Sequence, residues 1–227
     1  MNELDHFLEA ADNLERYGAD MKAGGTPVIG CLCSYAPEEL IYAAGAHPLR
    51  LFGTEESIMH ADRHLQAYCC SLARGVLEKA LSGQLDFLDG AVFPHTCDTI
   101  QRLSDIWRLN TKFDFFANVV FPVKLDTDSA RDYIEDIMIR FKGDLERWSG
   151  KEITDDALRR SIATFNSIRS ELSEIYRMRS RNPDCISGSQ LSSVVKGSMI
   201  MDSTKLPQQM ARLRQEIDEG RYTLPGN

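Results

Sequence analysis

Short apolar runs and helical periodicity alternate along the first half of the chain. Four apolar runs are bounded by turn residues: 28–33, 47–53, 88–93 and 115–123. Runs of this length are typical of buried strands. Three segments between them carry helical signals: 37–44, 61–81 and 98–109. The alternation predicts an α/β fold with a doubly wound, mostly parallel, Rossmann-like sheet.

The helix after the first apolar run is indicated by its two ends. Pro37 suits the first position of a helix, because the N–H that it lacks has no partner there. Glu38 and Glu39 place negative charge in the first turn, which the helix dipole favours. Gly45 is a typical residue just beyond the end of a helix.

The two later helices are indicated by spacing and by a cap. Four residues of 61–81 recur at helical spacing: Leu65, Cys69, Leu72 and Val76. This pattern predicts a helix over at least the second half of that segment. Asp98 or Thr99 is suited to cap the helix that runs to about residue 109.

The chain outside residues 26–126 is predicted to be helical. Residues 3–22 read as one amphipathic helix, and four charged segments follow the last strand: 127–148, 154–180, 189–199 and 204–219. We therefore expect an N-terminal helix in 1–25, an α/β domain in 26–126 and a helical second half in 127–227. The ending RYTLPGN resembles a linker that enters a further domain.

Composition narrows the possible classes of protein. The chain has 227 residues, 43% of them hydrophobic, and a formal net charge of −8, so nucleic acid is not expected as a partner. No run of about 18 apolar residues exists, and the charged N-terminus lacks the features of a signal peptide, so no membrane contact is expected. We expect a cytoplasmic protein, in which the six cysteines are thiols or metal ligands.

Three cysteines stand where loops of a parallel sheet hold ligands. Cys33 and Cys97 each follow an apolar run and precede a helix, and Cys70 lies near the start of another helix. Helix starts favour thiolates, which can hold a metal centre. Zinc and an iron–sulfur cluster are both open, and the spread over three loops favours the cluster.

Other roles for the cysteines stay open, because a free cysteine usually packs as a small apolar side chain. Cys31, inside the first apolar run, is expected to pack in this way. Cys69, on the apolar stripe, is either packed or a neighbour of the site. Cys185, in a later loop, is expected to be incidental.

Several polar residues near these cysteines are weaker candidates. Ser34 and Glu38 follow Cys33 and are candidate catalytic residues, because a carboxylate there can move a proton; the alternative for Glu38 is to stabilise the helix start. His95 is a candidate donor to a cluster sulfur, or a plain turn residue. His60 and His64 are either a pair that binds a metal or surface residues. Arg74 is either a contact for a phosphate group or a surface charge.

Three stretches of the chain resemble the 2-hydroxyacyl-CoA dehydratase and benzoyl-CoA reductase subunit family. They are GCLCSYAPEELIYAAGAHPLRLFG, LQAYCCSLARG and LDGAVFPHTCDTIQRLSDIW, and GKEITDDALRRSI is similar to a helical segment of that family. The resemblance covers roughly residues 26–200. Its motifs occur in the family's order, which makes the match specific.

The resemblance implies an iron–sulfur enzyme subunit. Family subunits hold a [4Fe-4S] cluster on three cysteines, which by motif are Cys33, Cys70 and Cys97, with the fourth iron open. They are oxygen-sensitive and work with a related second subunit or as a homodimer. An ATP-dependent iron–sulfur activator supplies single electrons, and the substrate is an acyl-CoA. The dehydratases remove water from a 2-hydroxyacyl-CoA by a radical route, and the aromatic branch reduces the ring of a CoA thioester.

Two alternatives follow from the same resemblance. One branch of anaerobic reductases holds a double-cubane cluster, and the extra thiols Cys31 and Cys69 keep that cluster open. Family subunits also continue into a second α/β domain, which we do not find in this sequence. The chain is therefore expected to be a piece of a longer subunit, or a non-catalytic module that binds a cluster. No glycine-rich nucleotide loop is present, so ATP is expected to bind the activator.

Overall fold

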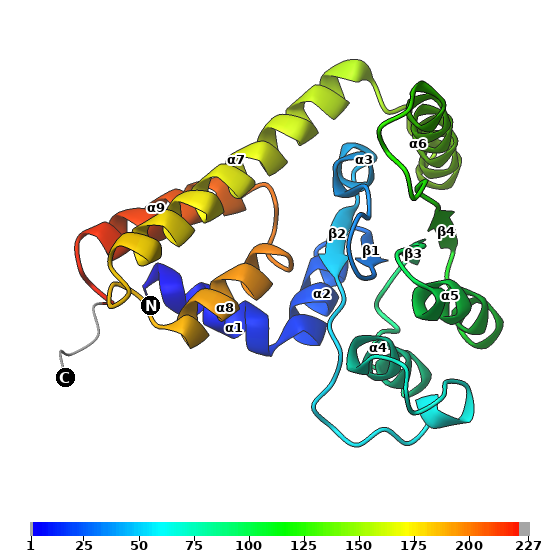
Figure 1. Cartoon of the computed structure of the whole chain (residues 1–227), viewed down its shortest axis with the longest axis horizontal. Coiled ribbons are helices and arrows are strands. Elements are labelled where there is room, and N and C mark those ends of the chain that lie inside the picture. Colours follow the sequence, from blue (N-terminus) through cyan, green and yellow to red (C-terminus); the bar gives the residue numbers. More distant parts are fainter. Residues whose placement is uncertain (1, 223–227) are drawn as a thin grey trace. The chain divides into compact units, whose positions relative to one another are not determined.

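The computed structural model of the chain describes residues 2–222 (Figure 1). They form two compact units. Among the described residues, one is made of 2–17 and 155–222, and we call it the helical unit. The other is Gly18–Thr154, and we call it the sheet unit.

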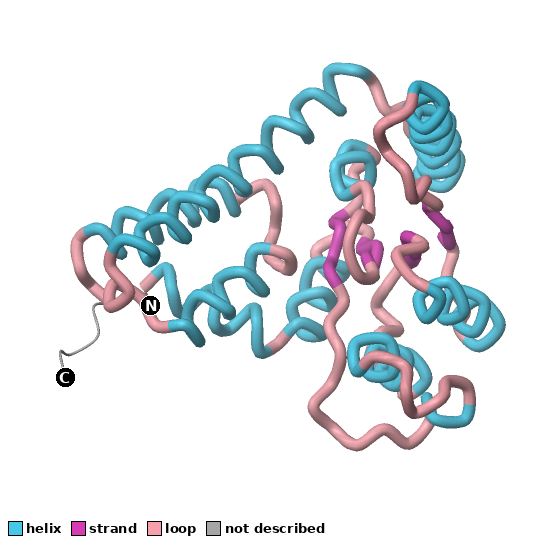
Figure 2. The backbone as a smooth tube through the Cα atoms, in the orientation of Figure 1, coloured by secondary structure: helices cyan, strands magenta, loops and turns pink. Residues whose placement is uncertain are grey.

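The sheet unit contains four parallel strands in the order β2-β1-β3-β4 (Figure 2). Their bounds are β1 Val28–Cys31, β2 His47–Arg50, β3 Gly90–Pro94 and β4 Phe115–Val119. β1 and β3 are central, and every residue of both strands is buried. The predicted α/β fold with a parallel sheet is confirmed, because all four apolar runs form strands.

Helices cover both faces of this sheet. Their bounds are α3 Glu38–Ala43, α4 Ser71–Leu81, α5 Asp98–Asn110 and α6 Asp128–Ser149, with a short 3-10 helix η1 at Ala61–Arg63. α3 and α6 lie on one side and contact each other, and α4 and α5 do the same on the other side (Figure 1). Between the sheet and α5, the rings of Phe93 and Trp107 pack edge to face with centroids 5.5 Å apart. The sheet is therefore doubly wound.

The helical unit is built from α1 Glu3–Asp12, α7 Asp155–Arg181, α8 Gly188–Ser198 and α9 Leu206–Asp218. α1 packs on α8 and α9, and α7 packs on α9. Phe7 of α1 is fully buried, and Gly197 of α8 comes so close that a Cβ there would lie 3.0 Å from the Phe7 carbonyl oxygen. Within the described part of the chain, no helix combines the length and the apolar character needed to span a membrane.

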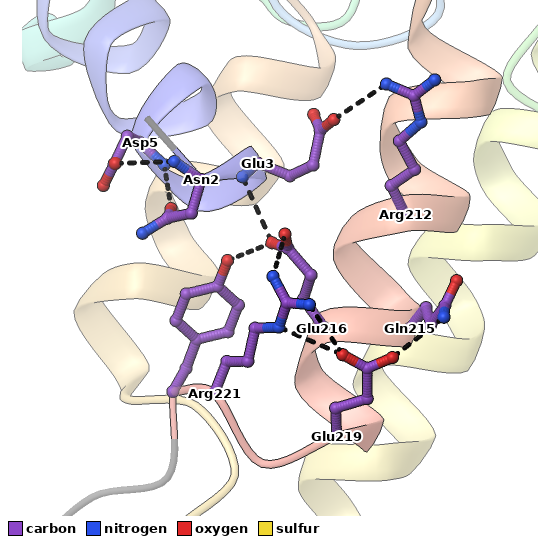
Figure 3. Close-up of polar contacts among 9 residues, drawn as sticks. Asn2, Glu3, Asp5, Arg212, Gln215, Glu216, Glu219 and Arg221 are labelled. Carbon is purple, nitrogen blue, oxygen red and sulfur yellow. Dashed lines mark hydrogen bonds and ion pairs between the residues drawn. The ribbon is translucent and has the colours of Figure 1, made fainter.

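A carboxylate joins the start of α1 to the end of α9 (Figure 3). Glu216 accepts hydrogen bonds from the Glu3 backbone N–H at 3.2 Å, from Arg221 at 3.0 Å and from the Tyr222 hydroxyl. Burial raises the pKa of Tyr222, and the bond to Glu216 adds to the rise. The polar side chains at this end of the helical unit thus form hydrogen bonds mainly with one another and with the backbone.

One predicted helix differs from the structure, and another is confirmed. The helix expected over 3–22 is two helices, because α2 Leu14–Ala23 begins after a break at Asn13. The backbone N–H of Asn13 and its side-chain amide both donate to the Glu9 carbonyl at 3.0 Å, so the side chain competes with the helix. In 61–81 the second half alone is α-helical, as expected, and Cys69 lies before the helix.

Two further expectations concern boundaries. The structure divides the chain at residues 17/18 and 154/155, not at 25/26 and 126/127, because α6 packs on β4 and α3. The residue at the cap of α5 is Cys97, and not the expected Asp98 or Thr99. The expectation for the ending RYTLPGN falls largely on 223–227, which lie outside the described residues.

Candidate functional site

The order of the strands creates one point at which the loops after two neighbouring strands, β1 and β3, run in opposite directions along the sheet. The chain passes from β1 to β2 on one side, and later from β3 to β4 on the other side. β1 and β3 are parallel neighbours, with Cys31 opposite Val92. Ligands of open α/β sheets lie in the crevice outside the carboxyl ends of the strands at such a switch point. The loops after β1 and β3 are therefore the first place to look for a site.

Cys33 lies in the loop after β1. It is half-buried, and its backbone is left-handed, with φ +52°. Ser34 beside it is exposed, and Tyr35 is also left-handed, with φ +69°. The Tyr35 ring packs edge to face on Phe121, in the segment after β4, with centroids 6.1 Å apart. The loop of Cys33 thus reaches from β1 toward the far side of β3.

Cys97 lies in the loop after β3 and caps α5. Its side chain is exposed and makes no capping hydrogen bond. The two residues before it carry buried polar atoms without a hydrogen-bond partner in the described structure, Nε2 of His95 and Oγ1 of Thr96. Such atoms are uncommon in folded proteins, and a water molecule, an ion or a ligand can satisfy them.

Cys70 caps α4 and is also exposed, with no capping hydrogen bond. α4 packs closely on the chain just after β2. A Cβ at Gly75 would lie 2.5 Å from the Thr54 nitrogen and 2.8 Å from the Gly53 Cα, so glycine is required there. This contact brings the start of α4 to the carboxyl end of β2. The three cysteines therefore belong to loops at the same edge of three adjacent strands.

The structure adds a residue that the sequence pattern did not single out. Arg50, the last residue of β2, donates one hydrogen bond to the Cys33 carbonyl and another to the Glu38 carboxylate. Burial would lower the pKa of Arg50, but the charge and the hydrogen bond of Glu38, together with Cys31 and Cys33, outweigh burial, so the pKa is raised. A signal was present in the sequence, because Arg50 is the one fully charged residue in the apolar run 47–53, and a buried charge needs a partner.

The remaining cysteines lie in other surroundings. Cys31 is fully buried in β1, where burial raises the pKa of its thiol. Cys185 is buried in the helical unit, and burial raises its thiol pKa as well. Cys69 is half-buried beside Cys70. Across residues 2–222, no three His, Cys, Asp or Glu side chains are grouped closely enough to hold a single metal ion.

The other predicted residues have partners inside the sheet unit. Nδ1 of His60 is 2.7 Å from the Glu78 carboxylate, while His64 is exposed. Burial opposes the charge of Glu78, but N–H groups of Ala61 and His60 lower its pKa to about 2. Arg74 donates two hydrogen bonds to Asp62, at 2.6 and 3.1 Å.

Known proteins resemble the chain over most of its length. It is 32% identical to a benzoyl-CoA reductase subunit from Thauera aromatica over 176 residues, which are 77% of this chain and 46% of that protein. It is 29% identical to the (R)-2-hydroxyglutaryl-CoA dehydratase subunit beta of Acidaminococcus fermentans, over 94% of this chain and 57% of that protein. It is 26% identical to the (R)-phenyllactyl-CoA dehydratase beta subunit of Clostridium sporogenes, over 94% of this chain and 58% of that protein.

The chain spans about half the length of the curated relatives that it matches. The family model described as 2-hydroxyglutaryl-CoA dehydratase, D-component, matches residues 33–226. That match begins at Cys33 and includes both other cysteines of the loops. Since it covers most of the sequence, the chain belongs to the 2-hydroxyglutaryl-CoA dehydratase D-component family.

Proposed function

We propose that this chain is the cluster-binding part of a 2-hydroxyacyl-CoA dehydratase-like enzyme. Cys33, Cys70 and Cys97 are the proposed ligands of a [4Fe-4S] cluster. The observation that carries the proposal is their placement in loops at the carboxyl ends of three adjacent strands, two of which flank the switch point. A cytoplasmic location, where thiols stay reduced, is part of the proposal.

The residues at this edge suit such a cluster. Cys70 and Cys97 are exposed at the N-terminal ends of α4 and α5, so a metal centre outside the sheet can reach both sulfur atoms. The unpartnered Nε2 of His95 and Oγ1 of Thr96 are groups that can donate to a sulfur. When bound, the cluster supplies single electrons at low potential. The chain's own part is to hold the three thiols and to orient these donors.

The relatives suggest the kind of substrate and partner. Two of them are named as beta subunits of dehydratases that act on 2-hydroxyacyl-CoA thioesters. By analogy we propose an acyl-CoA substrate, a related second subunit and an ATP-dependent iron–sulfur activator for the enzyme to which this chain contributes. Ser34 is exposed beside Cys33 and stays a candidate for contact with the substrate. The carboxylate of Glu38 is engaged with Arg50, which favours a positional role for it over proton transfer.

A second function is favoured by one comparison. The identity to the benzoyl-CoA reductase subunit is 32%, which makes a low-potential reductase a specific alternative, with a single or a double-cubane cluster. Half-buried Cys69 stands next to Cys70 and is the extra thiol that a larger cluster would use, whereas Cys31 is fully buried. Iron content separates the two cluster types, at about four or about eight atoms per chain.

The test is iron and acid-labile sulfide per chain after strictly anaerobic purification. We expect about four of each and a brown chromophore that bleaches in air. Cys33→Ala, Cys70→Ala and Cys97→Ala should each lose most of the iron. Cys185→Ala, a buried thiol of the helical unit, is the matched control and should keep it. A full iron load in the Cys97→Ala protein would contradict the proposal, and so would zinc in place of iron.

A further inference from the structure

The backbone of the Cys33 loop has a conformation that side chains rarely adopt. Within residues 2–222, Cys33 and Tyr35 are the non-glycine residues with positive φ, at +52° and +69°. Both lie between β1 and α3. The left-handed region is sterically unfavourable for residues with a Cβ, so such residues persist where surrounding contacts hold them. The question is which contacts hold this loop.

Arg50 provides such contacts at both ends of the loop. Its Nη1 donates to the Cys33 carbonyl, and its Nη2 donates to Oε1 of Glu38, the first residue of α3. The guanidinium therefore spans the loop from its first left-handed residue to the helix that follows. We call these three residues, Arg50, Glu38 and Cys33, the loop clamp.

The backbone of Arg50 is fixed by its place in the sheet. Arg50 stands opposite Cys31 in the parallel ladder of β1 and β2. The next residue, Leu51, donates its N–H to the Cys31 carbonyl at 3.0 Å, so the ladder continues past Arg50. The side chain thus starts from a rigid strand and holds a loop that begins just after Cys31.

The clamp is shielded from water and depends on the shape of arginine. The side chains of Arg50 and Glu38 are 16% and 20% exposed. A hydrogen bond to a charged group in such surroundings is stronger than a surface pair. The guanidinium is planar with several N–H groups, so it serves two acceptors at once, whereas the single ammonium of lysine is less suited to this.

We propose that Arg50 is a positioning residue for Cys33, which fixes the left-handed backbone of the cysteine loop through its carbonyl, with Glu38 as the anchoring counter-charge. The metal-binding role of Cys33 rests on the proposed function. The clamp itself is a property of the chain without metal.

The test compares hydrogen exchange of residues 31–38 in metal-free protein. Arg50→Gln should exchange about tenfold faster than the unchanged protein, because a charge-assisted hydrogen bond is lost. Arg50→Lys and Glu38→Gln should fall between the two. The matched control is Lys22→Gln, which removes an ion pair to Asp89 at the opposite end of the same sheet and should leave this segment unchanged.

Equal exchange in the Arg50→Gln, Lys22→Gln and unchanged proteins would overturn the inference. If Arg50→Gln does not fold, Arg50→Lys and Glu38→Gln decide in the same way: unchanged exchange of 31–38 in both contradicts the clamp. If the unchanged protein binds no iron, the proposed function fails, and the exchange experiment still decides the role of Arg50.

A second readout separates positioning beside the metal from general support of the fold. In protein that holds iron, Arg50→Gln should lower the midpoint potential, because a nearby positive charge favours the more negative reduced state. Glu38→Gln removes a negative charge and should raise it, although both variants loosen the same loop. Shifts of the same sign, or none in either variant, would contradict a guanidinium placed beside the site.

Discussion

The two units of the chain differ in how their polar groups are satisfied. In the helical unit, side chains close the helix ends, as Asn2 does for α1 and Ser187 does for α8, and Glu216 collects three donors. In the sheet unit, three buried polar atoms without a hydrogen-bond partner in the described structure lie beside the cysteine loops: Nε of Arg50, Nε2 of His95 and Oγ1 of Thr96. The helical unit also has such an atom, Oε2 of Glu3, but Arg212 donates to the other oxygen of the same carboxylate.

This contrast suggests that the helical unit contributes mainly to stability and that the cysteine loops of the sheet unit contribute to binding. A region whose polar groups are mostly paired with one another has little to offer a ligand. A loop cluster that leaves donors and thiols without partners is typical of a site completed by something from outside. We therefore expect substitutions in the helical unit to change folding, and substitutions at the carboxyl edge of the sheet to change binding.

The sharpest test of this contrast pairs one substitution from each unit. Phe7→Ala empties a fully buried position and should lower the free energy of unfolding by about 3–5 kcal/mol, with bound iron per folded chain unchanged. Cys97→Ala, at an exposed position, should change stability by less than about 0.5 kcal/mol and remove the iron. Urea unfolding and iron analysis of both proteins measure this. The opposite assignment of the two effects would break the contrast.

The sheet unit also contains a carboxylate, Glu78, whose hydrogen bonds to backbone N–H groups should contribute to stability. Glu78 accepts hydrogen bonds from the N–H groups of His60 and Ala61 at 2.7 and 2.8 Å. Glu78→Gln should lower the free energy of unfolding near neutral pH by about 2 kcal/mol, because charged acceptors make the stronger bonds. Urea titrations check this, and Glu55→Gln, at an exposed position in the loop between β2 and η1, should have little effect.

The same residue gives a dependence on pH. The pKa of Glu78 is lowered from 4.5 to about 2 in the folded protein, so the unfolded chain binds its proton first. Its contribution to stability is present above pH 4.5 and is lost as the pH falls from 4.5 toward 2. Glu78→Gln should flatten the stability profile in that window. A variant that loses stability with falling pH as steeply as the unchanged protein would contradict this assignment.

Two glycines of the sheet unit should respond with opposite signs. Gly75→Ala forces a Cβ against the backbone of Gly53 and Thr54 and should cost about 1–3 kcal/mol, with weaker iron binding because the start of α4 moves. Gly143→Ala, inside α6, meets only the tip of Arg147 at 3.4 Å and should stabilise by about 0.5–1 kcal/mol. Thermal unfolding compares them. Stabilisation by Gly75→Ala would mean that α4 and the segment after β2 are not tightly packed.

A small effect tests a helix cap in the helical unit. Ser187 accepts a hydrogen bond from the Gln190 N–H at 3.1 Å, and the Gln190 side chain accepts one from the Ser187 N–H at 2.9 Å. Ser187→Ala should cost about 1 kcal/mol. Ser192→Ala, at an exposed position inside the same helix, is the matched control and should be neutral or slightly stabilising. If both substitutions changed the free energy of unfolding equally, the cap formed by Ser187 would not contribute to stability.

Local pattern was sufficient for most elements of the fold. All four apolar runs are strands, and Gly45 ends α3 with φ +84°, because both signals depend on neighbours in the sequence. The same reasoning failed at Asn13, whose side chain competes for the Glu9 carbonyl. There a single residue outweighed the periodicity.

The sequence alone placed Cys33 between a strand and a helix, placed Cys70 and Cys97 near the starts of helices, and predicted a parallel sheet, because thiols, caps and apolar runs are features of consecutive residues. It did not give the order β2-β1-β3-β4, which makes β1 and β3 neighbours and sets the loops of Cys33 and Cys97 beside the switch point. Nor did it give the bond from Arg50 to the Cys33 carbonyl, which joins residues 17 positions apart. Strand order and such contacts arise from packing between distant segments, and they appear only when the chain is folded.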